Sequence, residues 1–250
     1  MVAAMLDVAG ISRSFGGLKA LDAISLAVAR GSITGLIGPN GAGKTTMFGV
    51  ISGFVAPDAG TVRYQGSDIT DEATHLRARR GIARTFQIVQ PFAGLSVVEN
   101  IAVGAYLRHA KPDEARAQAE AVAHRVGLGT MLDQPAAALT VAGRKRLELA
   151  RALATEPDLL LLDEVLAGLN PSEIRDIVPV IRDIRAGGVT ILMIEHVMQA
   201  VMALCDDVFV MAQGRMIAAG KPEMVCRDPH VIEAYLGQGA AARMQGAGHA

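Results

Sequence analysis

The segment Gly38-Pro39-Asn40-Gly41-Ala42-Gly43-Lys44-Thr45 constrains the fold of this chain more than any other feature. It matches the pattern G-x-x-x-x-G-K-[ST] and directly follows an apolar run, Ile33–Ile37, that has the length of a buried strand. Between a strand and a helix, such a loop closes its backbone N–H groups around phosphate oxygens. The segment therefore predicts an α/β fold that carries a phosphate-binding loop.

The polar residues of this loop suit a nucleoside triphosphate. Lys44 is expected to reach the β- and γ-phosphates, Thr45 to ligate Mg²⁺, and Thr46 to contact the α-phosphate. The N-terminus of the following helix adds its dipole to the attraction for phosphate. Because the chain has no Asn-Lys-x-Asp guanine motif, we predict ATP with Mg²⁺ as the ligand.

A second apolar run, Leu159–Leu162, ends in the acidic pair Asp163 and Glu164. The carboxyl ends of the strands form the ligand-binding edge of an open parallel sheet, so both carboxylates are expected there. Taken alone, an acidic pair after a strand also starts helices, but the loop at Gly38 favours a Walker B element. Asp163 would then hold Mg²⁺, often through water, and Glu164 would polarise the water that attacks the γ-phosphate.

Two more polar residues are candidates only because of these motifs. His196 follows the apolar run Val189–Ile194 and Glu195, so we expect it at a third strand end, where its imidazole would reach the γ-phosphate. Gln87 lies in Arg84-Thr85-Phe86-Gln87, at the beginning of a long helical stretch. Without the other motifs, these would be a structural histidine and an ordinary loop glutamine.

The remaining segments predict further elements of an α/β fold. A strand is expected at Val208–Met211, while about Pro91 to Ala154 has Ala-rich helical segments and little sign of strands. We predict that this stretch is a helical insertion in one domain that covers residues 1–237. Residues 238–250 are rich in glycine and alanine, without a pattern, and predict a frayed tail.

Capping residues and charges locate individual helices. Asp113–Val126 predicts a helix that ends at Gly127. Asn170 predicts the start of another helix, which Pro179 should kink because proline lacks a backbone donor. The basic run Arg144-Lys145-Arg146 predicts a solvated helix face.

Composition excludes several classes of protein. The formal net charge of -1 lacks the basic excess of a nucleic-acid binder, so we predict no nucleic-acid partner. Two cysteines without metal-site spacing indicate a reducing compartment. No uncharged apolar stretch reaches the ~18 to 20 residues of a spanning helix. We expect a soluble chain, and docking onto a membrane protein remains open.

Together the motifs resemble those of ATP-binding-cassette (ABC) ATPases, the motor subunits of ABC transporters, over about Leu6 to Gly237. The resemblance implies a RecA-like P-loop core with an antiparallel β subdomain and a helical subdomain at about residues 91–154. It also implies that Phe15 stacks on adenine, that Gln87 ligates Mg²⁺, and that His196 acts as a switch. Ala167-Gly168-Leu169-Asn170 would be the D-loop.

One motif departs from the family pattern. Where Leu-Ser-Gly-Gly-Gln is usual in the signature, this chain has Leu139-Thr140-Val141-Ala142-Gly143. In the family this segment caps the ATP held by a second ATPase subunit. Thr140 keeps the hydroxyl, whereas Ala142 adds a methyl group and Gly143 removes an amide. Slower hydrolysis, or asymmetric sites in a heterodimer, is therefore a hypothesis. Val165 also replaces a common proline, and we assign it no consequence.

Two short sequence segments narrow the resemblance from the ABC ATPase family to one subfamily. Ile194-Glu195-His196 and the closing Ile232-Glu233-Ala234-Tyr235-Leu236-Gly237 are similar to ATPases of branched-chain amino-acid importers. That subfamily implies a homodimeric or heterodimeric ATPase pair, transmembrane permeases, a periplasmic binding protein that acts indirectly, and a peripheral location on the cytoplasmic side of the inner membrane. Ile88 to Leu95 would face the permease, and amides, urea or aromatic acids remain possible solutes.

Three alternatives share parts of this pattern. An ATPase for lipid or lipopolysaccharide export has nearly the same motifs. A slow, regulatory nucleotide-binding partner would fit the altered signature, although Glu164 argues against a module that only binds. A soluble ABC protein acting on DNA or ribosomes commonly has a coiled-coil insertion or tandem cassettes, and this sequence has neither.

Overall fold

The computed structural model describes residues 4–87 and 90–236, which fall into two compact units. The first unit consists of residues 4–72 and 198–236, and the second of residues 73–87 and 90–197. The predicted tail, residues 238–250, lies outside the described residues, as do Ile88 and Val89 of the segment expected to face a permease.

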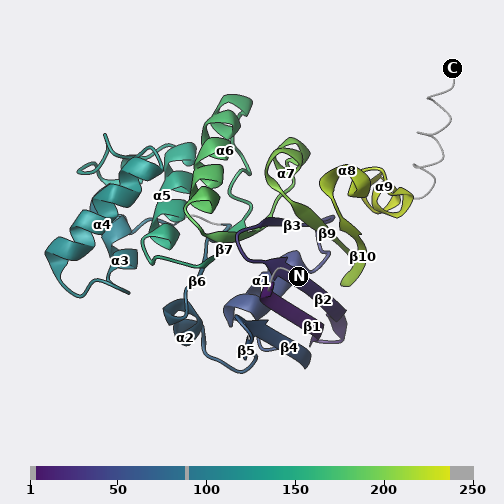
Figure 1. Cartoon of the computed structure of the whole chain (residues 1–250). Helices are drawn as coiled ribbons and strands as arrows, with labels where there is room; N and C mark the ends of the chain where they lie inside the picture. The colour runs from purple at the N-terminus through teal and green to yellow at the C-terminus, as the bar shows by residue number, and fades with distance from the viewer. Residues whose placement is uncertain (1–3, 88–89, 237–250) are drawn as a thin grey trace, which may run out of the picture. The chain divides into compact units, whose positions relative to one another are not determined.

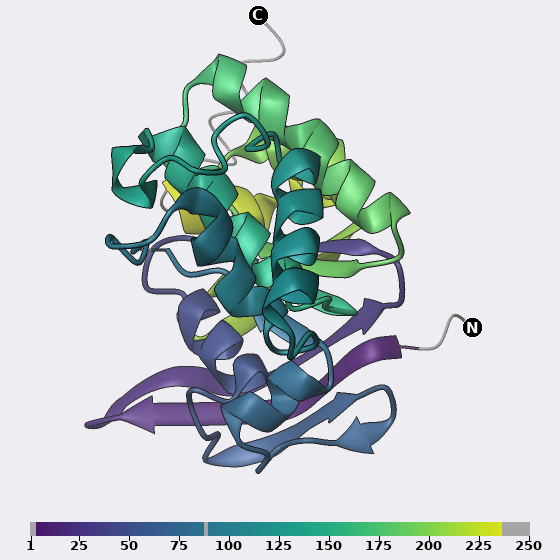
Figure 2. The same ribbon diagram turned by 90° about the vertical axis from the view of Figure 1, so that its left-hand side faces the viewer.

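The first unit contains an antiparallel group of strands in the order β2-β1-β4-β5. Their bounds are β1 Ala4–Phe15, β2 Leu18–Ala29, β4 Ala59–Tyr64 and β5 Ser67–Asp68. In β2, Ile24, Leu26 and Val28 are buried while Ser25 and Ala27 are exposed, the alternation of a strand with one face on the core. Figure 2 shows these strands as the purple and blue arrows. The antiparallel β portion predicted from the sequence is therefore confirmed.

A second group of strands in this unit leads into the phosphate-binding loop. β3 runs parallel to β9, and β10 pairs with β9 in the antiparallel sense (Figure 1). The bounds are β3 Ile33–Ile37, β9 Asp207–Ala212 and β10 Arg215–Gly220, with helices α1 Lys44–Ser52, α7 Met198–Leu204, α8 Pro222–Val225 and α9 Pro229–Leu236. Every residue of β3 is buried, which accounts for its uninterrupted apolar run.

The second unit contains three parallel strands whose carboxyl ends lie along one edge. β7 pairs with β6 on one side and with β8 on the other. The bounds are β6 Ile82–Arg84, β7 Leu159–Asp163 and β8 Thr190–Ile194. The register aligns Asp163 with Ile194, so the residues that follow β7 and β8 leave the sheet at the same level. This alignment is what brings the polar residues after the strands together.

Helices make up most of the rest of the second unit. Their bounds are α2 Thr74–Arg79, α3 Val97–Ala105, α4 Pro112–Arg125, α5 Val141–Leu153 and α6 Pro171–Ala186, with a 3-10 turn at Ala136–Ala138. α3, α4 and α5 pack against one another (Figure 1). Within the described part of residues 90–154, the only strand-like pairing is a bridge between Ser96 and Pro135. The helical character predicted for this stretch is confirmed.

The predicted helix ends agree closely with the structure. α4 coincides with the predicted helix to within one residue at each end, and Gly127 follows it with a φ of 78°. Asn170 caps α6, and its side chain accepts hydrogen bonds from the backbone N–H groups of Ser172 and Glu173. α6 continues through Pro179 to Ala186, so the proline does not end the helix.

Candidate functional site

The loop between β3 and α1 requires glycine at two of its positions. Gly38 has a φ of 147°, and a Cβ there would collide with the backbone carbonyl oxygen of Met211. Gly43 has a φ of 100°, and a Cβ there would collide with the carbonyl oxygen of Ala20. These close approaches hold the loop against β9 and β2, so that its shape is set before any ligand arrives.

Lys44 and the first turn of α1 give this loop its positive character. The Lys44 side chain is buried, and its Nζ donates hydrogen bonds to the carbonyl oxygens of Gly38 at 2.7 Å and Pro39 at 2.9 Å. The ammonium group therefore reaches back over the loop. Thr45 is exposed and Thr46 is half-buried at the start of the helix. Exposed hydroxyl and N–H groups at a helix N-terminus favour an anionic ligand.

Phe15, the predicted adenine contact, ends β1 with a partly exposed ring. The guanidinium carbon of Arg13 lies 4.8 Å from the ring centroid, and Arg13 also pairs with Asp58 at 2.7 Å. Phe15 is 44% exposed, so part of its surface is open to a base. An aromatic ring with an accessible face suits stacking on a nucleobase.

The three catalytic candidates of the second unit meet at one carboxylate. The side-chain amide of Gln87 donates to Glu164 Oε2 at 2.7 Å, and His196 Nε2 lies 2.6 Å from Glu164 Oε1. These residues follow β6, β7 and β8 respectively, at the carboxyl ends of adjacent parallel strands. The structure thus joins residues 77 and 32 positions apart in sequence into one hydrogen-bonded cluster.

Asp163, the predicted metal ligand, is buried at the end of β7 with one oxygen engaged. Its Oδ2 accepts a hydrogen bond from Arg84 at 2.8 Å, and its backbone N–H donates to Thr85 Oγ1 at 2.9 Å. Its Oδ1 is buried and has no hydrogen-bond partner among the residues that the structure describes. A carboxylate oxygen left free in this way suits Mg²⁺ or a water bound to it. The residue therefore fits the predicted cation.

Comparison with known proteins decides what kind of site this is. The model of the ABC transporter family matches residues 21–167, more than half of the chain. The chain is also 39% identical over 251 residues to the high-affinity branched-chain amino acid transport ATP-binding protein BraF of Pseudomonas aeruginosa, covering 94% of this chain and 98% of the relative. The chain belongs to the ABC transporter family.

Further comparisons refine the place of this ABC protein in its family. It is 38% identical over 250 residues to the LivG protein of Escherichia coli, another high-affinity branched-chain amino acid transport ATP-binding protein, covering 94% of this chain and 98% of the relative. Residues 215–241 match the model described as branched-chain amino acid ATP-binding cassette transporter. A crystal structure of an ABC transporter's ATP-binding cassette in its ADP conformation superimposes with a TM-score of 0.86 and 33% identity, covering 94% of this chain and all of that one. These relatives give no support to the lipid-export alternative.

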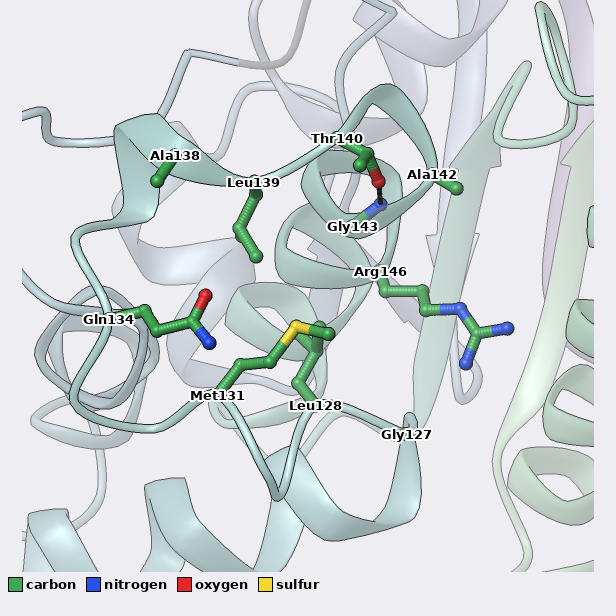
Figure 3. Close-up of a pocket in the computed structure, with 10 residues that line it drawn as sticks. All are labelled: Gly127, Leu128, Met131, Gln134, Ala138, Leu139, Thr140, Ala142, Gly143 and Arg146. Atoms are coloured by element: carbon green, nitrogen blue, oxygen red, sulfur yellow. Dashed lines mark hydrogen bonds between the residues drawn. The ribbon is translucent and has the colours of Figure 1, made fainter.

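The signature segment of this ABC protein forms the N-terminus of α5. Thr140 is the N-cap residue, and its hydroxyl accepts a hydrogen bond from the backbone N–H of Gly143 at 3.1 Å (Figure 3). Val141 is exposed, whereas Leu139 is buried. A Cβ on Gly143 would lie 3.2 Å from two atoms of Leu139, so the usual glutamine would require Leu139 to move. Glycine at position 143 therefore permits the close packing of Leu139 against the first turn of α5.

A cavity of about 300 Å³ lies beside this segment (Figure 3). The side chains of Leu128, Met131 and Gln134 line it from the loop that follows α4. Arg146 also borders the cavity and donates to the carbonyl oxygen of Val126 at 3.2 Å. The guanidinium group thus ties α5 to the end of α4 and supports the position of the signature helix.

One prediction about this helix is wrong. Lys145 does not belong to a solvated face: it is 8% exposed, and its Nζ donates to the carbonyl oxygen of Glu164 at 2.9 Å. A basic run has no helical periodicity of its own, so sequence alone could not show that the middle residue points inward. Arg144 turns back instead and donates to the carbonyl oxygens of Leu139 and Ala137 at 3.0 Å each.

Two further residues of the site were not recognised from the sequence as functional candidates. Arg84 precedes Gln87 in the same motif string and balances the charge of Asp163. Glu195 precedes His196 and is 1% exposed; it accepts a hydrogen bond from the backbone N–H of Leu166 at 2.9 Å. Burial raises the pKa of Glu195 to about 7, and the nearby charge of Glu164 adds to this effect. An acidic residue directly after a buried apolar run was the available signal.

None of the helices within residues 4–87 and 90–236 is long and apolar enough to cross a membrane.

Proposed function

We propose that this ABC protein is the ATP-hydrolysing subunit of an importer for branched-chain amino acids or related small amides and amino acids. The observation that carries the proposal is the convergence of Gln87 and His196 on the carboxylate of Glu164. A module that only binds nucleotide has no need for a carboxylate held by two neighbouring polar side chains. The names of the two branched-chain relatives support the choice of solute.

The phosphate-binding loop holds the nucleotide in this proposal. Residues Gly38 to Thr46 surround the phosphates, and the ammonium of Lys44 exchanges its two carbonyl partners for β- and γ-phosphate oxygens. Phe15 stacks on the adenine with its accessible ring face. Because these groups are preorganised by close backbone contacts, little ordering remains to oppose binding.

Glu164 is the general base. It accepts a proton from the water that attacks the γ-phosphate, while the amide of Gln87 orients the carboxylate. His196 moves its hydrogen bond from Glu164 to the γ-phosphate when ATP is bound, which frees Glu164 Oε1 for the water. Asp163, Thr45 and Gln87 would hold Mg²⁺, whose charge offsets the negative charge that develops on the phosphate oxygens.

The remaining parts of the proposal concern assembly. The signature segment, residues 139–143, caps the ATP of a second ATPase subunit, identical or related, with the N-terminus of α5. Permease subunits in the membrane contact the segment at residues 88–95, and a periplasmic binding protein delivers the solute. The chain is peripheral on the cytoplasmic side, with residues 1–237 as one ATPase domain, residues 91–154 as its helical subdomain and residues 238–250 as a tail.

The test is magnesium-dependent ATPase activity of the purified chain, compared with Glu164→Gln, alone and with its co-encoded ATPase and permease subunits. We expect activity that rises with the partners and falls at least a hundredfold in the variant, because the amide cannot accept the proton from water. Binding of a non-hydrolysable ATP analogue serves as the control, and it should be retained in Glu164→Gln. Equal, low turnover in both proteins would refute the motor and favour a regulatory nucleotide-binding subunit.

A further inference from the structure

We propose that Lys145 and Glu195 are positioning residues, two buried side chains that hold Glu164 and His196 in their catalytic arrangement, Lys145 from the signature helix α5 and Glu195 from the end of β8. This inference rests on the proposed function of Glu164 as the base. In this inference, Lys145 and Glu195 do not contact the nucleotide. They act only through the backbone of the residues that contact it.

The backbone of Glu164 is the part of the site most in need of support. Its φ is 51°, in the left-handed region that residues other than glycine rarely adopt. Two hydrogen bonds from other elements fix this conformation: the Glu164 N–H donates to the carbonyl oxygen of Ile194 at 3.0 Å, and its carbonyl oxygen accepts from Lys145 Nζ at 2.9 Å. If Lys145 were absent, one of these two restraints on the backbone would be lost.

Lys145 reaches this point from the helix that begins at the signature. It lies five residues after the cap Thr140, so its position follows any movement of the first turns of α5. Its Nζ also lies 3.5 Å from the carbonyl oxygen of Gln87, a longer contact than its hydrogen bond of 2.9 Å to the carbonyl oxygen of Glu164. One buried ammonium group thus contacts the backbone of two of the three residues that meet at the Glu164 carboxylate.

Glu195 forms hydrogen bonds with His196, the third of these residues, and with the loop that follows Glu164. Its Oε1 accepts from the backbone N–H of Leu166 at 2.9 Å, and its carboxyl group also accepts from the backbone N–H of His196. Leu166 belongs to the segment between Walker B and the D-loop. The carboxyl group therefore connects that segment to the residue that contacts Glu164 from β8.

The two groups belong together because both are buried and both bond to the backbone of the same loops. Lys145 is 8% exposed and Glu195 is 1% exposed, and buried polar groups are costly unless they form hydrogen bonds. Both side chains form their hydrogen bonds with backbone atoms of the loops that carry the catalytic candidates. This arrangement is expected of residues that orient catalytic residues without touching the substrate.

The experiment measures steady-state hydrolysis of MgATP by the full chain, with its partner subunits, for Lys145→Met and Lys145→Arg. Methionine keeps the length of the side chain and removes both the charge and the donors, whereas arginine keeps them. We expect kcat to fall at least tenfold in Lys145→Met, with the affinity for a non-hydrolysable ATP analogue within threefold of wild type, because the phosphate-binding loop is untouched. Lys145→Arg should recover kcat to within threefold.

The matched control is Lys111→Met, the same change at an exposed lysine that pairs with Glu114 at 2.8 Å at the beginning of α4. It should leave both kcat and affinity unchanged. A kcat of Lys145→Met within twofold of wild type would overturn the proposal. If Lys145→Met does not fold, Glu195→Gln decides, because it keeps the shape and one acceptor: we expect at least a fivefold loss of kcat at unchanged affinity, and a loss below twofold overturns the pair.

Amide hydrogen exchange separates this inference from the proposed function. In Lys145→Met, the N–H groups of Glu164, Leu166 and His196 should exchange at least tenfold faster than in wild type. If wild type proves inactive, the proposed function fails, and faster exchange at these three positions still supports the positioning role. Unchanged exchange would overturn it, whether or not the wild-type chain hydrolyses ATP.

Discussion

Glu195 should make the stability of this protein depend on pH, and Glu195→Gln should remove that dependence. Burial raises the pKa of Glu195 from 4.5 to about 7 in the folded chain. The charge of Glu164 adds to the effect of burial on this pKa, whereas the charge of Lys145 opposes it. The folded state therefore holds a proton that the unfolded state has already released. A group of this kind favours folding below the unfolded pKa and loses that contribution as pH rises through the folded value.

The magnitude follows from the size of the shift. At about 1.36 kcal/mol per pKa unit, the change from 4.5 to about 7 corresponds to about 3.4 kcal/mol, of which about 2.5 kcal/mol develops between pH 5 and pH 8. The slope, and not the absolute stability, carries the information.

The assay is urea unfolding at several pH values from 5 to 8, followed by circular dichroism because the chain has no tryptophan. The free energy of unfolding of wild type, relative to Glu195→Gln, should fall by about 2.5 kcal/mol across the range. Glu114→Gln, at an exposed glutamate, controls for the loss of one carboxylate. Parallel curves for wild type and Glu195→Gln would refute the reasoning, since they would mean that Glu195 ionises equally in both states.

Two further predictions concern local structure. Gly43→Ala places a Cβ against the carbonyl oxygen of Ala20 at a φ of 100°, so ATP affinity measured by calorimetry should fall at least tenfold; an unchanged affinity would mean that the loop can move aside. Asn170→Ala removes the capping box of α6 and should lower the free energy of unfolding by about 1 kcal/mol. The corresponding drop of about 2 to 4 °C in Tm is measurable by scanning calorimetry, and an unaltered Tm would contradict it.

Most of the fold could be predicted from local patterns. β3, β7, β8 and β9 are short apolar runs because they are buried along much or all of their length, and burial leaves a direct mark on composition. The ends of α4 and the start of α6 were equally legible, since glycine and asparagine at helix ends act through the adjacent backbone alone. The shorter strand β6 left no comparable signal, because three residues are too few to show a period.

The sequence predicted which residues belong to the candidate site, but not which hydrogen bonds join them. Glu164 and His196 were each placed after a strand, and parallel strands bring such positions to one edge, whereas Gln87 was placed only at the beginning of the helical stretch. That Gln87 and His196 bind the two oxygens of one carboxylate depends on the register between β7 and β8 and on the path of the loop after β6. Register is a property of the pairing and not of either strand.

The sequence alone determined the phosphate-binding loop, the acidic pair after β7 and the family resemblance, because each depends on residues that are adjacent along the chain. Only the tertiary structure showed what Lys145 and Glu195 contact. In the sequence, Lys145 stands in a basic run that predicts a surface residue, and Glu195 is only an acidic residue beside a histidine. Both are buried by elements far away in sequence. Whether a charge is buried, and what it then binds, is set by the packing of the whole unit, and no local pattern encodes it.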